Sequence, residues 1–346
     1  MTYEILILTV IWIGLTLYGL LAGADFGGGV WSAFASGGTK ARQRELIVKA
    51  IAPVWEANHV WLIFVVTGLF ASFPRAFEVL SVALYLPFSI ALAGIVLRGA
   101  AFAFRSHGDP SSGWQRTWTQ IFGAASLVSP LALGAAAGAI AAGRIRVHDG
   151  IVDAGVVGSW ATWLPALTAL LALAVCAYLA ASYLTVEAIG AGDAELAEAF
   201  RTRAIASGVV AGALAAVGLL VARSHAHILW HGMVHRGFPF VILSAAGGVT
   251  ALAATVSRRY RVARIASATA VAAVLGAWGA AQWPLLIVPD LTAAGAAAPD
   301  ATLHAVFAGL VVGGALLVPS LLALFRVFKS PREIGRPPKL AGEPER

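Results

Sequence analysis

Nine apolar stretches, each near the roughly 20 residues that cross a bilayer core as a helix, dominate this chain. They cover approximately residues 5–34, 51–73, 79–104, 118–142, 160–187, 203–222, 239–256, 264–286 and 303–328. A segment in lipid must satisfy its backbone hydrogen bonds internally, and runs of this length do so as helices. The sequence therefore predicts an all-α integral membrane protein with about nine transmembrane helices.

The composition agrees with a lipid environment, because 59% of the 346 residues are hydrophobic and only 12% are charged. A net charge of +7 would suggest nucleic-acid binding in a soluble protein, but here the charges lie in short loops between apolar stretches. We therefore expect lipid and no nucleic acid around the chain. The single cysteine, Cys176, lies inside a stretch and excludes an internal disulfide and a C-x-x-C-H haem attachment. The first stretch exceeds a signal-peptide core and is expected to be retained.

The basic residues are divided unevenly between the two sets of loops. If the spans alternate, one set of loops and the tail hold 17 Lys and Arg residues, and the other set holds 5. The smaller set is Arg75, Arg144, Arg146, Arg223 and Arg236. The positive-inside rule then places the N-terminus outside and the C-terminus in the cytoplasm, for a protein of the bacterial inner membrane.

A polar connection between the fourth and fifth spans divides the chain. We expect two four-helix bundles and one peripheral helix, since the ninth span is left over. The predicted parts are a first bundle over 1–142, a periplasmic loop over 143–159, a second bundle over 160–286, an outer loop with the ninth helix over 287–329, and a cytoplasmic tail over 330–346.

Ionisable residues inside spans are costly, so Asp25, Glu56 and Arg98 are candidates for function. At 1.5 Å per residue they lie about 13, 8 and 9 Å from the cytoplasmic ends of spans one, two and three. At this matched depth two carboxylates and a guanidinium can form one buried network. Two interpretations stay open, a staple that holds the helices together and a path for protons.

The segment Ile51-Ala-Pro-Val-Trp-Glu-Ala-Asn-His-Val-Trp61 gathers polar groups at the start of one span. Trp55, Asn58 and Trp61 recur at every third position, so they lie on broadly one side of the helix. Their donors need partners in lipid, which favours a protein partner on this face. An interfacial aromatic belt is the alternative, and it suits Trp55 better than the deeper Trp61.

The glycine-rich stretch Gly23-Ala-Asp-Phe-Gly-Gly-Gly29 lacks the Lys-Ser or Lys-Thr of a phosphate loop and lies in a span. We expect close helix packing around Asp25 instead.

Four histidines cluster in an outer loop: His225, His227, His231 and His235. The last three share one helix face, which suits a metal site or a haem edge. No carboxylate or cysteine accompanies them, and an interfacial amphipathic segment explains them equally well. We therefore predict no metal site.

Four motifs together resemble subunit II of cytochrome bd oxidases. They are Asp25-Phe-Gly-Gly-Gly29, the segment Ile51 to Trp61 with the following Leu-Ile, Leu69-Phe-Ala-Ser-Phe-Pro74, and Leu97-Arg-Gly99. The second motif is the specific one, and the others support it by order and spacing. The resemblance covers roughly residues 1–105. The chain departs from the family pattern at Glu56, where the family usually has Asp, and at Ala57, where it usually has Gly. These departures leave open that the chain belongs to a variant oxidase, such as a cyanide-insensitive form or a second copy of the enzyme in the same organism.

The resemblance implies a haem-poor subunit of a quinol oxidase that reduces dioxygen to water. Haem b, haem d and the quinol site would belong to the partner, subunit I, and small accessory subunits and a quinone bound to this chain are further expectations. Glu56 and Asp25 would match the proton path, with Arg98, Asn58 and His59 as a supporting polar network. Trp55 and Trp61 would match the partner interface and dioxygen access. Ubiquinol and menaquinol are both compatible with the sequence.

A second function fits the same residues. An autonomous secondary transporter could use Asp25, Glu56 and Arg98 as its coupling site. Transporter sites usually lie near the bilayer midplane, whereas these charges lie towards the cytoplasm, so the oxidase subunit is the leading hypothesis.

The uneven division of basic residues generates a topology prediction. Alkaline phosphatase fused within the connection 143–159 should be active, because the enzyme folds only outside the cytoplasm, and the same reporter at the C-terminus should be inactive. A green fluorescent protein at the C-terminus is the matched control and should fluoresce. Activity of the phosphatase at both sites would contradict the prediction.

Overall fold

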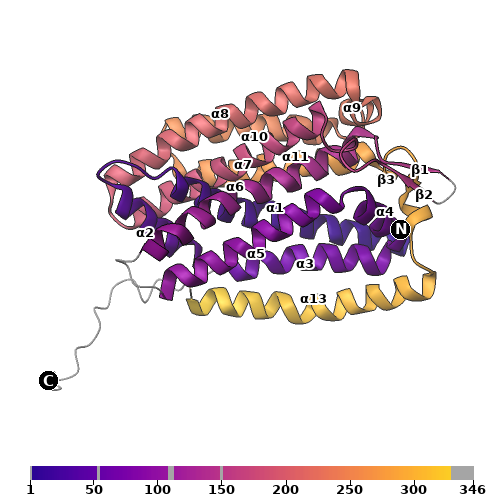
Figure 1. The fold of residues 1–346 in the computed structure, drawn as a ribbon, viewed down its shortest axis with the longest axis horizontal. Helices are drawn as coiled ribbons and strands as arrows, with labels where there is room; N and C mark the ends of the chain where they lie inside the picture. Colours follow the sequence, from indigo (N-terminus) through magenta and orange to yellow (C-terminus); the bar gives the residue numbers. More distant parts are fainter. Residues whose placement is uncertain (1, 53–54, 108–112, 149–150, 329–346) are drawn as a thin grey trace.

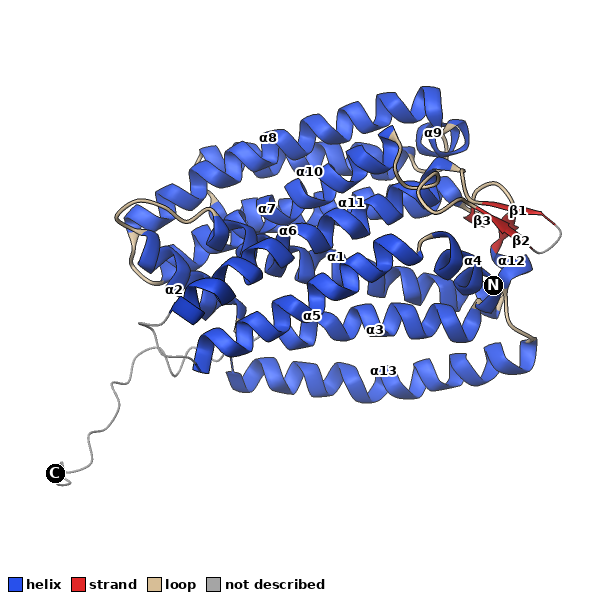
Figure 2. Cartoon of the chain, viewed as in Figure 1, coloured by secondary structure: helices blue, strands red, loops and turns tan. Residues whose placement is uncertain are grey.

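The computed structural model describes residues 2–52, 55–107, 113–148 and 151–328. Figure 1 shows long helices running side by side, and Figure 2 shows that the described elements are helices apart from two short hairpins. The helices of the first half are α1 Tyr3–Ala33, α2 Lys40–Ile51, α3 Trp55–Ser72, α4 Pro74–Ala83, α5 Tyr85–His107 and α6 Gly113–Ala142. Those of the second half are α7 Trp163–Gly190, α8 Ala194–His225, α9 His227–Val234, α10 Phe238–Val256, α11 Tyr260–Gln282, α12 Ala293–Ala296 and α13 Asp300–Phe328.

The prediction of an all-α integral membrane protein is confirmed. Among the described residues, eight helices are long and apolar enough to cross a bilayer, and the bent pair α3 and α4 raises the number to nine if it counts as one span. The α13 helix lies at the edge of the bundle beside α3, as expected of a peripheral ninth helix (Figure 1). In lipid this arrangement satisfies the backbone of each span internally.

The most extensive helix contacts join α7 to α8, α5 to α6 and α10 to α11. The α7 helix also packs closely against both α6 and α1, so it connects the helices of the two halves of the chain. The division into two four-helix bundles with the boundaries given above stays a prediction.

Three predicted spans differ from the helices observed, two of them near α3 and α4. The stretch 51–73 begins in α2, an amphipathic helix that carries Lys40, Arg42, Arg44 and Lys49, and the membrane helix α3 begins only at Trp55. The stretch 79–104 begins in α4, which bends by 118° from α3. Pro74 opens α4, and the residue before a proline is excluded from helical geometry, so the chain turns there.

The eighth stretch, 264–286, also runs past its helix. The α11 helix ends at Gln282, because Pro284 cannot continue it. Leu285–Ile287 instead forms strand β3, which pairs with β4 Leu291–Thr292. A second antiparallel hairpin, β1 Arg146–His148 with β2 Ile151–Asp153, lies in the connection between α6 and α7.

We call the end of the bundle that holds these strands, α4, α9 and α12 the hairpin end, and the opposite end the α2 end (Figure 1). At the hairpin end, Arg146 Nε donates to Asp290 Oδ2 at 2.9 Å and joins the two loops. Burial alone would raise the pKa of Asp290, but hydrogen bonds from Arg146 and the Val147 N–H hold this pKa below its ordinary value.

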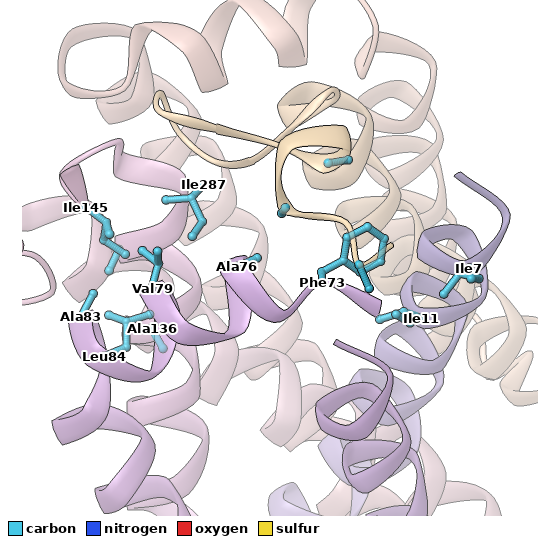
Figure 3. Packing of buried hydrophobic residues seen from close by; sticks show 14 of the residues in the cluster. Ile7, Ile11, Phe73, Ala76, Val79, Ala83, Leu84, Ala136, Ile145 and Ile287 are labelled. Atoms are coloured by element: carbon cyan, nitrogen blue, oxygen red, sulfur yellow. The ribbon is translucent and has the colours of Figure 1, made fainter. Parts of the chain in front are cut away.

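A buried apolar cluster closes the hairpin end. Figure 3 shows Phe73 and Val79 from the turn and helix α4 among side chains of α1, α6 and β3. Phe73, Val79, Leu84 and Ile145 are each fully buried. The bend after α3 thus places α4 across this end of the bundle (Figure 1).

The contacts of the basic residues agree with the predicted alternation of the spans. At the α2 end, Arg42 pairs with Asp193 and Glu195, and Arg203 donates to Gln43. Arg236, from the smaller predicted set, contacts the Ala281 carbonyl at the other end. Which end faces the cytoplasm stays a prediction.

Candidate functional site

An ion pair between α1 and α5 lies in the middle of the bundle. Arg98 Nη2 donates to Asp25 Oδ1 at 2.6 Å, and the two residues are only 1% and 3% exposed. Asp25 lies eight residues before the end of α1 and Arg98 nine before the end of α5, or about 12 and 13 Å of helix rise. The matched depth predicted from the sequence therefore brings these two side chains together.

Arg98 has further partners that fix its position. Its Nη2 also donates to the Asp25 carbonyl at 3.1 Å, and its Nε donates to Ser126 Oγ on α6 at 3.2 Å. The guanidinium lies over the rings of Phe26 and Phe122, 5.2 and 4.9 Å from their centroids. A planar cation between two aromatic faces is stabilised by both. Arg98 thus joins three spans, and Ser126 is a site residue that the sequence analysis missed.

Asp25 is less completely satisfied than its partner. Its Oδ2 is buried and has no hydrogen-bond partner among the described residues. Tyr18 lies two turns earlier on α1, and its buried hydroxyl also lacks a described partner. Buried polar atoms in proteins are normally paired, with protein or with ordered water. Asp25 and Tyr18 are thus the buried polar groups of α1 whose hydrogen bonds the described residues do not complete.

The glycines after Asp25 allow the close packing that the site requires. A Cβ on Gly27 would collide with the Cys176 carbonyl on α7, and one on Gly29 would collide with Ser126 Oγ on α6. A Cβ on Gly28 would meet Ile51 Cδ1 at 2.5 Å. Each glycine thus faces a different helix. The expectation of close packing is confirmed, because small residues let helix backbones approach.

The α3 motif lies next to this pair. Asn58 is 4% exposed, and its Nδ2 donates to the Leu21 carbonyl of α1 at 3.4 Å. His59 Nδ1 lies 2.8 Å from the Trp55 carbonyl, one turn earlier on the same helix. Glu56 lies in the first turn of α3, but its side chain is outside the part of the chain that the structure describes. Whether Glu56 joins the network stays a prediction.

The shared face of Trp55, Asn58 and Trp61 is not formed as expected, since Asn58 points into the bundle. Positions i, i+3 and i+6 spread over about 120° of a helix circumference, so one of them can be buried while another lies at the edge. Trp55 packs against Phe102, with ring centroids 5.4 Å apart. Trp61 is partly buried and packs against the cluster formed by Tyr18, Ala22, Phe26 and Cys176.

His59 lies among three aromatic side chains. The ring centroids of Tyr18, Phe26 and Trp55 are 6.2 to 6.5 Å from the centroid of its imidazole, in edge-to-face geometry. Elsewhere in the described chain, no group of three or more His, Cys, Asp or Glu side chains is arranged to hold a metal ion.

Comparisons with known proteins identify relatives along the whole chain. Residues 3–328 match the family described as cytochrome bd terminal oxidase subunit II. A Bacillus subtilis (strain 168) protein assigned as a cytochrome bd menaquinol oxidase subunit II is 24% identical over 338 residues, 94% of this chain and 96% of that one. The cytochrome bd-I ubiquinol oxidase subunit 2 of Escherichia coli (strain K12) is 31% identical over 141 residues, 39% of this chain and 36% of that one.

A solved structure shares the fold. A chain in the structure of bd oxidase from Geobacillus thermodenitrificans superposes with a TM-score of 0.75 and 24% sequence identity, over 95% of this chain and 99% of that one.

The buried ion pair generates a prediction about assembly. Asp25→Asn leaves the Arg98 guanidinium buried without its counter-charge, which typically costs about 3–5 kcal/mol, so the yield of folded protein in membranes should fall. Asp25→Asn combined with Arg98→Met removes both charges and should recover most of that yield. The measurement is the amount of monodisperse protein extracted from membranes.

Glu78→Gln is the matched control, because it removes an exposed partner of Arg75 at the hairpin end and should not alter the yield. An equal loss in the single and double variants would contradict the pairing energy assigned to Asp25 and Arg98.

Proposed function

Because this chain belongs to the cytochrome bd terminal oxidase subunit II family, we propose that it delivers protons to the oxygen-reducing centre of its complex and helps assemble that complex. The chain is a multi-pass membrane subunit of a quinol:O2 oxidoreductase. Its membership of the subunit II family implies that it assembles with a subunit I. The comparisons give no support to the transporter alternative. We propose that the α2 end faces the cytoplasm, with the N-terminus outside.

The proposal rests above all on the carboxylate of Asp25, which is buried in the membrane and has one oxygen paired and the other free of described partners. The Asp25–Arg98 pair cancels its own charge, so the pair can lie in the bilayer interior without adding net charge there. Glu56 lies in the first turn of α3, at the α2 end, where protons from the cytoplasm would arrive. We assign the proton path to Glu56 and Asp25, with Glu56 as the group that takes up protons first, and the supporting role to Arg98, Asn58 and His59.

We place the haems, haem b and haem d, in subunit I. The family implies haems in the oxidase complex. The packing of His59 by aromatic rings favours their placement outside this chain. No step of the proton path proposed here involves a haem ligand from this subunit. A quinone bound to this chain and small accessory subunits stay predictions, as does the choice between menaquinol and ubiquinol.

The surface of α3 offers a face for subunit I. Val60, Ile63, Val66 and Phe70 recur every three or four residues, so they lie on one side of the helix, and they are 46 to 64% exposed. Trp55 and Trp61 lie on the same helix, only partly buried. A partner on this face would cover its apolar side chains. Trp61 lies on the opposite side of the helix, against Tyr18 and Phe26 of α1, and we propose that it lies near the route by which dioxygen reaches the partner.

Glu56→Gln tests the proton-carrying role. Glutamine keeps the shape of the side chain and its capacity for hydrogen bonding but cannot titrate, so assembly and haem content should be normal while quinol-driven oxygen consumption falls at least about 10-fold. Glu56→Asp should retain much of the activity, because it restores a titratable group. The oxygen electrode and the haem spectrum of the purified complex measure both quantities.

Glu45→Gln is the matched control, since Glu45 is exposed and paired with Lys49 on α2. Wild-type respiration by a normally assembled Glu56→Gln complex would show that Glu56 is only a structural residue.

A crosslinking experiment tests the α3 face. With a photoreactive amino acid at Ile63, the chain should crosslink to subunit I, and the same amino acid at Val217 on α8, which is 44% exposed, should crosslink to lipid or not at all. Crosslinks to subunit I from Val217 alone would place the interface on the second half of the chain instead.

A further inference from the structure

A pocket at the hairpin end has no part in the proton path proposed above. It has a volume of about 410 Å³ and is formed by α9 and the turn that follows it. Its lining residues are His227, Ile228, His231, Gly232, His235 and Arg236. The three histidines follow one another at intervals of four residues, which places them along one side of α9 and its extension. A smaller pocket of about 200 Å³ adjoins it, with His227 and Ile228 in both linings.

The geometry of the histidines does not suit a metal ion. The rings of His231 and His235 stack, with centroids 5.9 Å apart and planes 27° apart. Nitrogen lone pairs lie in the plane of an imidazole, so two nearly parallel stacked rings are poorly oriented to share one ion. Arg236 adds a positive charge to the same lining, which a cation would avoid. The metal-site alternative considered from the sequence therefore has no support in this arrangement.

The same residues suit an anion. The lining contains a guanidinium and three imidazoles and no carboxylate. Arg236 Nη2 donates to the Ala281 carbonyl at 3.4 Å, which holds the side chain against α11 and leaves its other N–H groups for a ligand. His235 Nδ1 lies 2.8 Å from the His231 carbonyl, and this contact holds the ring in the stacked position. A guanidinium fork binds the oxygens of a phosphate in pairs.

The pocket lies close to apolar surfaces that we expect to face lipid. The α9 helix, which carries most of the lining, lies between the end of α8 and the start of α10 (Figure 1). Leu220 and Phe238, on these two helices, are 64 and 51% exposed, as expected of side chains that face acyl chains. Ile228, exposed in the lining itself, gives the pocket an apolar wall. The basic groups therefore lie at the level of the lipid headgroups, with an apolar surface leading away from them.

We propose that this pocket binds a phosphate group through Arg236, His227 and His231, and that the group belongs to a phospholipid headgroup or to inorganic phosphate. His235 positions the ring of His231 by stacking. The inference depends on the membrane location of the chain and not on the role of Glu56, so failure of one leaves the other intact.

Binding to the purified oxidase complex in detergent tests the proposal. Three probes are used: dihexanoyl phosphatidylglycerol, the same diacylglycerol without the phosphate group (dihexanoylglycerol), and inorganic phosphate. Dihexanoyl phosphatidylglycerol should bind, and dihexanoylglycerol should not. Arg236→Gln should weaken binding about 10-fold or more, since hydrogen bonds to a charged group are among the stronger ones. His231→Ala should weaken it less, because it removes one donor without a permanent charge.

Arg223→Gln is the matched control, because Arg223 lies at the same end over the ring of Trp230, 5.8 Å from its centroid, and does not line the pocket. Competition by inorganic phosphate at equal affinity would identify free phosphate as the ligand, and competition only at much higher concentration would identify the lipid headgroup. Equal binding by Arg236→Gln, Arg223→Gln and the wild type would overturn the proposal. Equal binding of dihexanoylglycerol and the phospholipid would also overturn it.

Discussion

The bilayer interior contains no water to solvate a polar side chain, and this constraint explains most of the arrangement around Arg98. A guanidinium that is 1% exposed on α5 can be tolerated only with polar and aromatic partners, and it receives them from two other spans, α1 and α6. Asp25 supplies the counter-charge from α1, Ser126 accepts a hydrogen bond on α6, and two aromatic faces cover the guanidinium. The glycines that follow Asp25 have no side chains to keep α1 apart from α6 and α7. The ion pair and the glycines therefore depend on each other.

The two ends of the bundle have different chemistry, and the proposed roles follow from that difference. The α2 end carries exposed ion pairs such as Arg42 with Asp193, and it leads to the first turn of α3, where Glu56 lies. The hairpin end is closed by the apolar cluster around Phe73 and carries the basic pocket of α9. Proton delivery from the α2 end and phosphate binding at the hairpin end can thus proceed in one subunit without sharing a residue.

Much of the fold could be predicted because lipid imposes a simple length rule on apolar helices. The meeting of Asp25 and Arg98 could be predicted for the same reason, since helix rise converts sequence position into depth. Ser126 could not, because a serine within a span carries no charge that marks it, and only the structure shows that it accepts a hydrogen bond from Arg98 and lies against Gly29. The separate helix α4 was missed because its apolar residues continue the hydropathy of the neighbouring spans, although Pro74 marks the bend. The inward position of Asn58 depends on how α3 is rotated about its axis, which spacing alone does not determine.

The proposed role of this subunit is to bring protons from the α2 end to the oxygen-reducing centre by way of Glu56. Proton uptake during a single turnover tests this role most directly, with the fully reduced complex mixed with dioxygen in the presence of a pH-indicating dye. We expect the Glu56→Gln complex to take up protons from the medium much more slowly than the wild type, while dioxygen still binds at the wild-type rate. Proton uptake at the wild-type rate in the Glu56→Gln complex would contradict it.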